Sequence, residues 1–409
     1  MMRKIKKILS SVGLLLLSLF IRRKENWYAF GSWRGQLYID NSRYLYEYIR
    51  KTNEDCVCIW IGNIHVREAI VNHPKTFVYA KNSFRSAIAL LKCKYMFCSQ
   101  MHSDDLCEFN VFRGSVITYL HHGMPVKRWG ADYAGGHLDF KTKKPIINAF
   151  RKLTATDIQY DYFATSSKLH EVSNLSALDY RGCTEEKNLR SGTPRNDLLI
   201  NATEDQIAQF KKMYADLLQF DSRKKIVMYL PTFRRKGTPT RSFVEGVSEK
   251  EYEQIHHILA ESNAILIEKN HFAEDAHQAG GKRLTRDDII HVDQNVNVQE
   301  MLLICDVLIS DYSGAFLDYI LLDRPVIHYA YDYDDYKNHD SGLYYEIEDF
   351  AAGDVVSDFH ELCLSLRRNL NDSKLNQEKR KYVREKYMTY ENGSASQIIY
   401  GNVVLGKEV

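Results

Sequence analysis

The chain has 409 residues, which is more than one typical domain holds, so we expect two domains. Hydrophobic residues make up 44% and charged residues 26% of the chain, as in an ordinary globular protein. The formal net charge of +2 provides no overall field for nucleic acid, so we expect no nucleic-acid partner and only local anion sites.

Residues 8–21 (ILSSVGLLLLSLFI) form an apolar run with basic residues on both sides. The run is short for a membrane-spanning helix, which needs about 20 apolar residues, and the three positive charges after it oppose export. We therefore expect residues 1–24 to form a helix on the inner membrane surface, which predicts a peripheral protein at the cytoplasmic face of the cell membrane. A buried packing helix, a secretory signal and a true span stay open as alternatives.

Short apolar runs, each followed by a polar turn and a helical pattern, recur along the chain and predict parallel βαβ units. In the first half the predicted strands are Trp27–Phe30, Val57–Ile61, Thr76–Tyr79, Tyr95–Cys98, Val116–Leu120 and Tyr162–Ala164. In the second half they are Ile226–Leu230, Ala264–Ile267, Ile289–Val292, Val307–Ser310 and Val326–Tyr329.

These patterns predict an α/β protein with two Rossmann-like domains that face a cleft. The expected boundaries are 25–197 for the N-terminal domain, 198–221 for a helical connector and 222–409 for the C-terminal domain. Eight cysteines are scattered without a CxxC pair or zinc spacing, so we interpret them as reduced core residues. No metal site and no tightly bound cofactor are expected.

Parallel sheets bind ligands at the carboxyl ends of their strands, where helix N-termini point N–H groups into a crevice. The stretch DVLISDYSGAFLDY (306–319) passes from a predicted strand to a helix expected over about Ala315–Leu322. Ser313 and Gly314 at this junction predict a phosphate site, and a plain helix cap is the alternative. Arg234 and His271 follow two other strands of the same sheet, and an arginine there suits a pyrophosphate.

The second constellation is His121-His122-Gly123-Met124-Pro125-Val126-Lys127, which follows a strand of the first domain. A glycine after a strand-terminal histidine permits a tight turn that exposes the imidazole, the side chain best suited to accept a proton near neutral pH. A single histidine is more often structural, but two adjacent ones at a strand end favour a functional site.

Two further stretches are ambiguous. Residues 190–197 (RSGTPRND) read as a hinge, with Arg195 lining the cleft as the functional alternative. The acidic run 331–340 (YDYDDYKNHD) does not match a calcium loop, and we interpret it as a polar loop over the site.

Four motifs occur in order: HGMPVK, GTPRNDLL, PTFRR and DVLISDYSGAFLDYILLDRPVIHYAYDYDDY. Together they resemble the CDP-glycerol glycerophosphotransferase family, the teichoic-acid primases and polymerases, from about residue 32 to 355. The early stretch GSWRGQLYIDNSRYLYEYI also resembles the start of the family. The resemblance implies a glycosyltransferase-B fold with the nucleotide donor held mainly by the C-terminal domain.

By the same resemblance, the chain would transfer glycerol phosphate from CDP-glycerol, or ribitol phosphate from CDP-ribitol, to a polyprenyl-linked glycan at the inner membrane face. His122 and His271 match the family's motif histidines, Arg234 its arginine and Ser313 its phosphate-binding serine. We expect Thr232, Gly314, Asp311 and Asp318 to complete the donor site, and His121, Lys127 and Arg195 to line the acceptor side.

Two residues depart from the family pattern: Met124 stands where threonine is usual, and Gly314 where a second serine is usual. With glycine in place of the second serine, the backbone N–H groups and Ser313 would still hold the phosphate. The change therefore affects the expected choice between alditols more than the expected transfer reaction. Two other hypotheses stay open: a nucleotide-sugar glycosyltransferase or epimerase on the same fold, and a catalytically silent subunit of an assembly complex.

Overall fold

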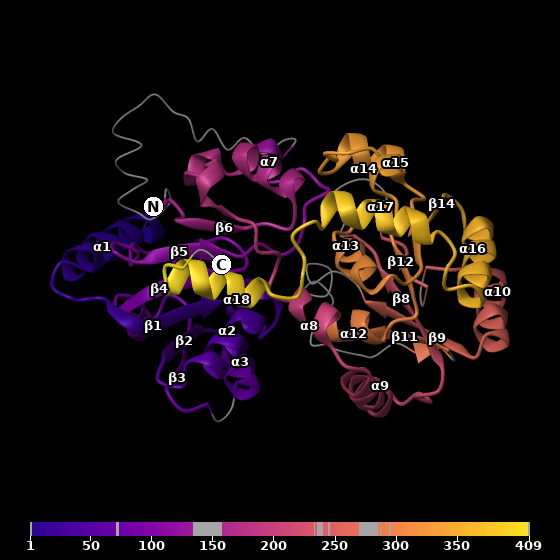
Figure 1. Ribbon diagram of the computed structural model, residues 1–409, viewed down its shortest axis with the longest axis horizontal. Helices are drawn as coiled ribbons and strands as arrows, with labels where there is room; N and C mark the ends of the chain where they lie inside the picture. The colour runs from indigo at the N-terminus through magenta and orange to yellow at the C-terminus, as the bar shows by residue number, and fades with distance from the viewer. Residues whose placement is uncertain are drawn as a thin grey trace. The chain divides into compact units, whose positions relative to one another are not determined.

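The computed structural model describes residues 2–70, 73–133, 158–232, 234, 240–243, 246–269, 285–286, 288–293 and 296–407. The chain forms two compact units (Figure 1). The first unit contains Met1–His122, Gly136–Asp197 and Tyr390–Val409. The second unit contains Gly123–Gly135 and Leu198–Thr389.

The first unit contains a parallel sheet with the strand order β3-β2-β1-β4-β5-β6-β7. Its strands are β1 Lys24–Gly31, β2 Val57–Ile61, β3 Thr76–Tyr79, β4 Cys93–Cys98, β5 Val116–Tyr119, β6 Tyr162–Ala164 and β7 Asn188–Leu189. Its helical segments are α1 Met2–Leu17, η1 Trp33–Gly35, α2 Asp40–Thr52, α3 Ile64–Ala69, α4 Phe84–Leu90, α5 His102–Asp105, α7 Lys168–Ala177, η3 Asp179–Arg181, η4 Glu185–Lys187, α18 Ala395–Ile399 and η6 Tyr400–Val404. Central strands such as β2 are apolar along their length because helices cover both faces of the sheet.

The C-terminal segment 390–409 completes the first unit rather than the second, where the sequence placed it. Ile399, Tyr400 and Val403 pack into the same core as Tyr28 and Leu45. The carboxylate of Asp197 accepts hydrogen bonds from the backbone N–H groups at positions 395 and 396 (2.8 and 2.9 Å). These contacts join segments about 200 positions apart, which a local sequence pattern does not reveal.

The second unit contains a sheet with the order β10-β11-β9-β8-β12-β13-β14, in which only the β10–β11 pair is antiparallel. Its strands are β8 Lys225–Leu230, β9 Ala264–Lys269, β10 Thr285–Arg286, β11 Ile289–Val292, β12 Val307–Ser310, β13 Val326–Tyr329 and β14 Asp354–Val356. Its helical segments are η2 Gly130–Asp132, α9 Glu204–Leu218, α10 Glu249–Glu261, α12 Val298–Ile304, α13 Ala315–Tyr319, η5 Ile320–Leu322, α14 Tyr333–His339, α15 Ile347–Phe350, α16 Phe359–Asn371 and α17 Gln377–Tyr387. Helix α8 Asn196–Asn201 lies where the chain enters this unit.

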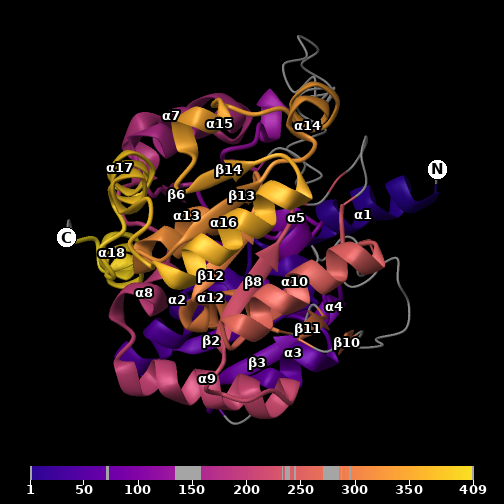
Figure 2. The same ribbon diagram turned by 90° about the vertical axis from the view of Figure 1, so that its right-hand side faces the viewer.

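Helices α10 and α16 cover one face of the second sheet, where their apolar side chains form a single core with β8, β9, β12 and β13 (Figure 2). In both units the first strand of the sheet in chain order lies inside the sheet, and later strands are added on both sides of it: β2 and β4 around β1, and β9 and β12 around β8. This is the doubly wound order, in which ligands bind beyond the carboxyl ends of the strands where the winding reverses.

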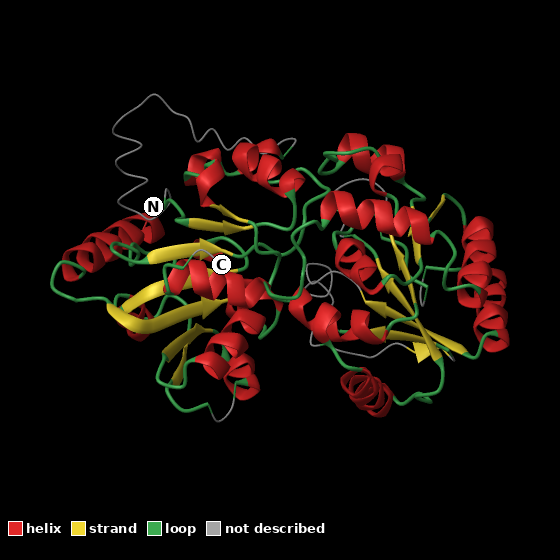
Figure 3. Ribbon diagram, viewed as in Figure 1, coloured by secondary structure: helices red, strands yellow, loops and turns green. Residues whose placement is uncertain are grey.

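The predicted α/β class with parallel sheets is confirmed, and the alternation of strands and helices is visible in Figure 3. Residues 198–221, predicted as a helical connector, hold most of α8 and all of α9 and belong to the second unit. The run 331–340 was predicted as a loop, but Tyr333–His339 form helix α14. Within the described residues, no helix is both long and apolar enough to cross a bilayer.

Candidate functional site

The loop after β12 in the second unit is organised by the carboxylate of Asp311, which is 1% exposed. Its Oδ1 accepts hydrogen bonds from the backbone N–H groups of Tyr312 (2.6 Å) and Ser313 (3.2 Å). Both carboxylate oxygens also lie 2.9 Å from the backbone nitrogen of Thr232, at the end of the adjacent strand β8. Asp311 therefore fixes the loop from inside, and the prediction that it contacts the donor is not supported.

The half-buried residues of this loop are Ser313, Gly314 and Ala315. Helix α13 begins at Ala315, and its first N–H donates to Oγ of Ser313 at 3.4 Å. The helix expected over 315–322 is present as α13 followed by the 3-10 turn η5. A ligand reaching this loop would therefore meet the hydroxyl of Ser313 and the backbone at positions 314 and 315.

Arg234 lies at the centre of a buried ionic network. Its Nε and Nη2 donate to the two oxygens of Asp332 (2.7 and 3.0 Å), and its Nη1 donates to Asp311 (2.7 Å). Burial opposes the charge of this guanidinium, but the two carboxylates outweigh that effect and raise the pKa of Arg234 above its usual value. The rings of Tyr312, Tyr331 and Tyr336 surround it.

The guanidinium of Arg234 is only 3% exposed. It therefore supports the loop through Asp311, and the prediction of a direct contact with pyrophosphate is not supported by this geometry. Asp332, which the sequence analysis did not assign to the site, binds two of the three guanidinium nitrogens. Its only signal was membership of the acidic run 331–340.

The other predicted donor residues differ in accessibility. Asp318 is 1% exposed and accepts a hydrogen bond from Gln299 (3.3 Å), so it joins α12 to α13 instead of facing a ligand. Thr232 is 2% exposed, and its Oγ1 has no hydrogen-bond partner among the described residues. A buried hydroxyl without a partner is rare and marks Thr232 as a candidate ligand contact. His271 lies outside the described residues.

In the first unit, a tight turn follows β5 and exposes His122. Backbone φ is 61° at His121 and 118° at Gly123, and only glycine adopts the second value readily. The side-chain nitrogen of Asn41 donates to the carbonyl oxygens of residue 120 (3.1 Å) and His121 (2.7 Å). Asn41, a residue of the early stretch with no role assigned from sequence, thus anchors the chain directly before His122.

His121 itself is buried. It is 1% exposed, and its Nε2 lies 2.8 Å from Oδ1 of Asn174. Burial, with the neighbouring His170 and His122, holds the pKa of His121 well below its usual value. The side chain is therefore neutral and structural, which corrects the prediction that it lines the acceptor side.

His170, in the first turn of α7, packs its ring against that of His121, with ring centroids 4.3 Å apart. Its Nδ1 accepts a hydrogen bond from the backbone N–H of Ser166 (3.2 Å), and its Nε2 has no partner among the described residues. Burial lowers the pKa of His170 to about 3. His170 was not predicted as a site residue, and its only signal is its position shortly after the hydroxyl residues 165–167 at the end of a strand.

Arg195 belongs to the first unit, where its Nη1 contacts Asp40 (2.9 Å) and its backbone N–H donates to Oδ1 of Asn41 (3.0 Å). Its guanidinium is 12% exposed. Gly192 in the same stretch has φ of 75°, which allows the turn before it. The segment is thus tied to the anchor residue Asn41.

Lys127 lies on the second unit, because the chain changes units directly after His122. It forms an isolated antiparallel bridge with Leu343 and is half-buried. The structure therefore groups the predicted residues into two sets. His121, His122 and Arg195 belong to the first unit, and Lys127, Thr232, Arg234, Asp311, Ser313, Gly314 and Asp318 belong to the second.

A sequence model of the family described as CDP-glycerol:poly(glycerophosphate) glycerophosphotransferase matches residues 14–405. The chain belongs to this family. Membership places it among transferases, and the relatives below are named for teichoic acid synthesis.

A teichoic acid glycerol-phosphate transferase of Staphylococcus aureus is 25% identical over 380 residues, which are 92% of this chain and 92% of that protein. A teichoic acid poly(glycerol phosphate) polymerase of Staphylococcus epidermidis is 26% identical over 374 residues. The match covers 90% of this chain but only 49% of the polymerase, so the chain spans about half the length of that relative. Ribitol-phosphate polymerases of Staphylococcus aureus also match, over about half of this chain.

Among solved structures, the wall teichoic acid polymerase TagF aligns with a TM-score of 0.76 at 23% identity, covering 99% of this chain and 98% of that chain. This likeness confirms the glycosyltransferase-B-like fold expected for a glycerophosphotransferase of this family. The prediction that the two domains face a cleft stays a prediction.

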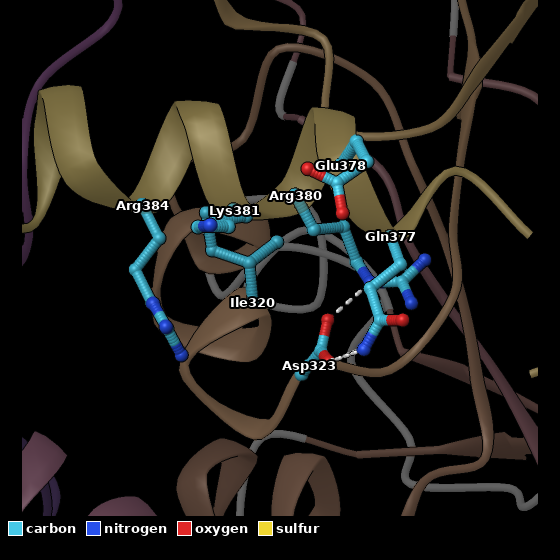
Figure 4. Close-up of a pocket in the computed structure, with 7 residues that line it drawn as sticks. All are labelled: Ile320, Asp323, Gln377, Glu378, Arg380, Lys381 and Arg384. Atoms are coloured by element: carbon cyan, nitrogen blue, oxygen red, sulfur yellow. Dashed lines mark hydrogen bonds and ion pairs between the residues drawn. The ribbon is translucent and has the colours of Figure 1, made fainter. Parts of the chain in front are cut away.

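Elsewhere on the second unit, α17 and η5 border a pocket of about 290 Å³. Figure 4 shows Asp323 bonded there to Gln377 and Arg380, with Lys381 and Arg384 on the same helix. None of the predicted site residues lines this pocket. Among the described residues, no group of three or more acidic, histidine or cysteine side chains could hold a metal ion.

Proposed function

We propose that this chain transfers an alditol phosphate to a hydroxyl group of a lipid-linked glycan and releases CMP. The alditol phosphate that we propose first is glycerol phosphate, with CDP-glycerol as its donor. The observation that carries the proposal is the family match over residues 14–405, which includes all four ordered motifs. The product would be a teichoic acid or another phosphate-containing surface polymer, such as a capsule.

In the proposed reaction the acceptor oxygen attacks the β-phosphorus of the donor. The new O–P bond forms as the bond between the β-phosphorus and the bridging oxygen breaks, and CMP leaves with that oxygen. His122, exposed on its tight turn, takes the proton of the acceptor hydroxyl. Phosphoryl transfer depends mainly on positioning and charge stabilisation, which would fall to Ser313, the backbone at Gly314 and, as a prediction, His271.

Arg234 supports this site without touching the donor. Its ion pair with Asp311 holds the carboxylate that in turn binds the N–H groups of Tyr312 and Ser313. Because those N–H groups are already bound, we assign the phosphate contacts to the hydroxyl groups of Ser313 and Thr232 and to the start of α13.

The test is to incubate the purified full chain with a lipid-linked acceptor and CDP-glycerol, CDP-ribitol or a UDP-sugar, and to measure nucleotide release. Release of CMP from CDP-glycerol, with no nucleotide released from the UDP-sugar, is the expected result. Preference for CDP-ribitol would instead support the ribitol-phosphate alternative, which the matches to ribitol-phosphate polymerases favour. Turnover of the UDP-sugar alone would support a glycosyltransferase and reject the proposal, and no turnover would support a silent subunit.

We also propose that α1 and the turn after it, residues 18–20, attach the chain to the inner membrane surface, where a lipid-linked acceptor is presented. Ser11 and Leu14 are buried against the first unit, whereas Leu16, Leu19 and Phe20 are 56%, 57% and 86% exposed. Basic residues flank this apolar surface on both sides. Exposed apolar side chains beside basic ones are typical of a helix that lies in the interface of anionic lipids.

Replacing Leu16, Leu19 and Phe20 together with serine is expected to weaken sedimentation with anionic vesicles by at least about tenfold, because their apolar surface drives insertion. These substitutions leave Leu14 and Arg23 in place, which deletion of residues 1–24 would remove. The matched control is Leu364→Ser on α16 of the second unit, also exposed at 52%. Equal sedimentation of the triple variant and the control would reject membrane attachment through this helix.

A further inference from the structure

Residues 123–133, which we call the arm, connect the exposed His122 of the first unit to the surface of the second. The arm pairs with residues 342–344 through the isolated antiparallel bridge between Lys127 and Leu343. The N–H of Tyr344 donates to the carbonyl oxygen of Val126 (2.9 Å), and the N–H of Arg128 donates to that of Gly342 (3.1 Å). The hydroxyl of Tyr344 also donates to Oδ2 of Asp132 (2.6 Å), which is a short bond to a charged acceptor.

The start of the arm lies against the predicted phosphate loop. A Cβ atom added at Gly314 would lie 3.0 Å from the carbonyl oxygen of Met124. Backbone φ at Gly314 is −61°, a value that any residue adopts, so glycine matters here for space and not for conformation: a Cβ atom would require the Met124 carbonyl to shift by a few tenths of an ångström. Met124 and Gly314, the two departures from the family motifs, are therefore in contact with each other.

Chain connectivity then restricts His122. Consecutive Cα atoms are 3.8 Å apart, so the Cα of His122 lies within about 8 Å of that of Met124. On the other side, Asn41 holds the carbonyl oxygens of residue 120 and His121. His122 is thus joined directly in the chain to a segment held by Asn41 on one side and to the arm on the other.

We propose that Gly314 and Tyr344 are positioning residues, which hold the arm so that the imidazole of His122 is placed for proton transfer. The proposal rests on the proposed function, because it takes His122 as the base. Gly314 acts at the start of the arm by leaving room for the Met124 carbonyl, and the hydroxyl of Tyr344 acts at the other end of the arm through its bond to Asp132. A misplacement of about 1 Å in a reacting group can cost about 10²-fold in rate.

The test compares Gly314→Ala and Tyr344→Phe with the wild-type chain by steady-state kinetics of CMP release and by hydrogen exchange of residues 120–128. We expect kcat to fall by at least about fivefold in each variant, with the donor KM unchanged and faster exchange in the arm. The matched control is Tyr333→Phe, which removes a hydroxyl bonded to Glu346 outside the arm and is expected to keep wild-type kcat.

A raised donor KM with unchanged kcat would show that Gly314 serves only the donor loop, and this result would overturn the proposal. Wild-type kcat in both variants, or unchanged exchange in the arm, would overturn it as well. Tyr344→Phe keeps the test decisive if Gly314→Ala does not fold, because the two residues hold opposite ends of the arm. A wild-type chain without CMP release would instead reject the proposed function, and the positioning role with it.

Discussion

Replacement of His122 by alanine is expected to lower the rate of CMP release by about 10²–10⁴-fold, the usual effect of losing a general base. The side chain is exposed on a turn whose flanking backbone is fixed by Asn41, so the substitution should leave the fold intact. The rate is measured with CDP-glycerol and a lipid-linked acceptor, and folding is checked by thermal unfolding.

His339→Ala is the matched control, because His339 is another exposed histidine, on α14, at 69% exposure. The control should release CMP at the wild-type rate. A folded His122→Ala protein that turns over as fast as this control would show that another group takes the acceptor proton.

Replacement of Arg234 by alanine is expected to reduce the free energy of unfolding by about 3–5 kcal/mol. The substitution leaves the carboxylates of Asp311 and Asp332 buried, each 2% exposed, without their cation. Urea unfolding of the purified chain measures the effect. Asp311 also binds the backbone of Tyr312 and Ser313, in the loop where we propose the donor phosphate binds, so donor binding should weaken in the same variant.

The control for this second prediction is Arg223→Ala. Arg223 pairs with Asp221, but its side chain is 85% exposed, so water screens the pair and little stability should be lost. A stability loss in Arg234→Ala no larger than that of the control would mean that the buried network contributes nothing net to the fold.

Strand prediction succeeded where burial is complete. The runs Val57–Ile61, Val307–Ser310 and Val326–Tyr329 appear with the predicted bounds, because continuous apolar runs have few other stable environments in a doubly wound sheet. The missed strands are the two-residue pairs β7 and β10 and the three-residue edge strand β14. Their hydrogen bonds depend on a neighbouring strand that is already in place. Two or three residues are also too few to show the pattern of apolar side chains from which a strand is predicted.

The positions of the candidate site residues could be predicted better than their roles. The rule that parallel sheets bind ligands at the carboxyl ends of their strands correctly placed Thr232, Arg234 and Asp311 after the neighbouring strands β8 and β12. It could not show that Arg234 and Asp311 bind each other, because charged side chains at the same edge of a sheet can pair with one another as readily as with a ligand. Asn41 was missed for a related reason: its role depends on backbone carbonyl groups about 80 positions away.

The return of residues 390–409 to the first unit has a consequence for biosynthesis. A ribosome releases this chain in sequence order, so the first sheet emerges before the second but lacks Ile399, Tyr400 and Val403 of its core until the whole second unit has been made. Most of the second unit is one continuous segment, 198–389, which can fold while the first unit still lacks residues 390–409. The usual order of maturation, N-terminal domain first, is thereby reversed, and a premature stop between residues 390 and 399 would leave the first unit without part of its core.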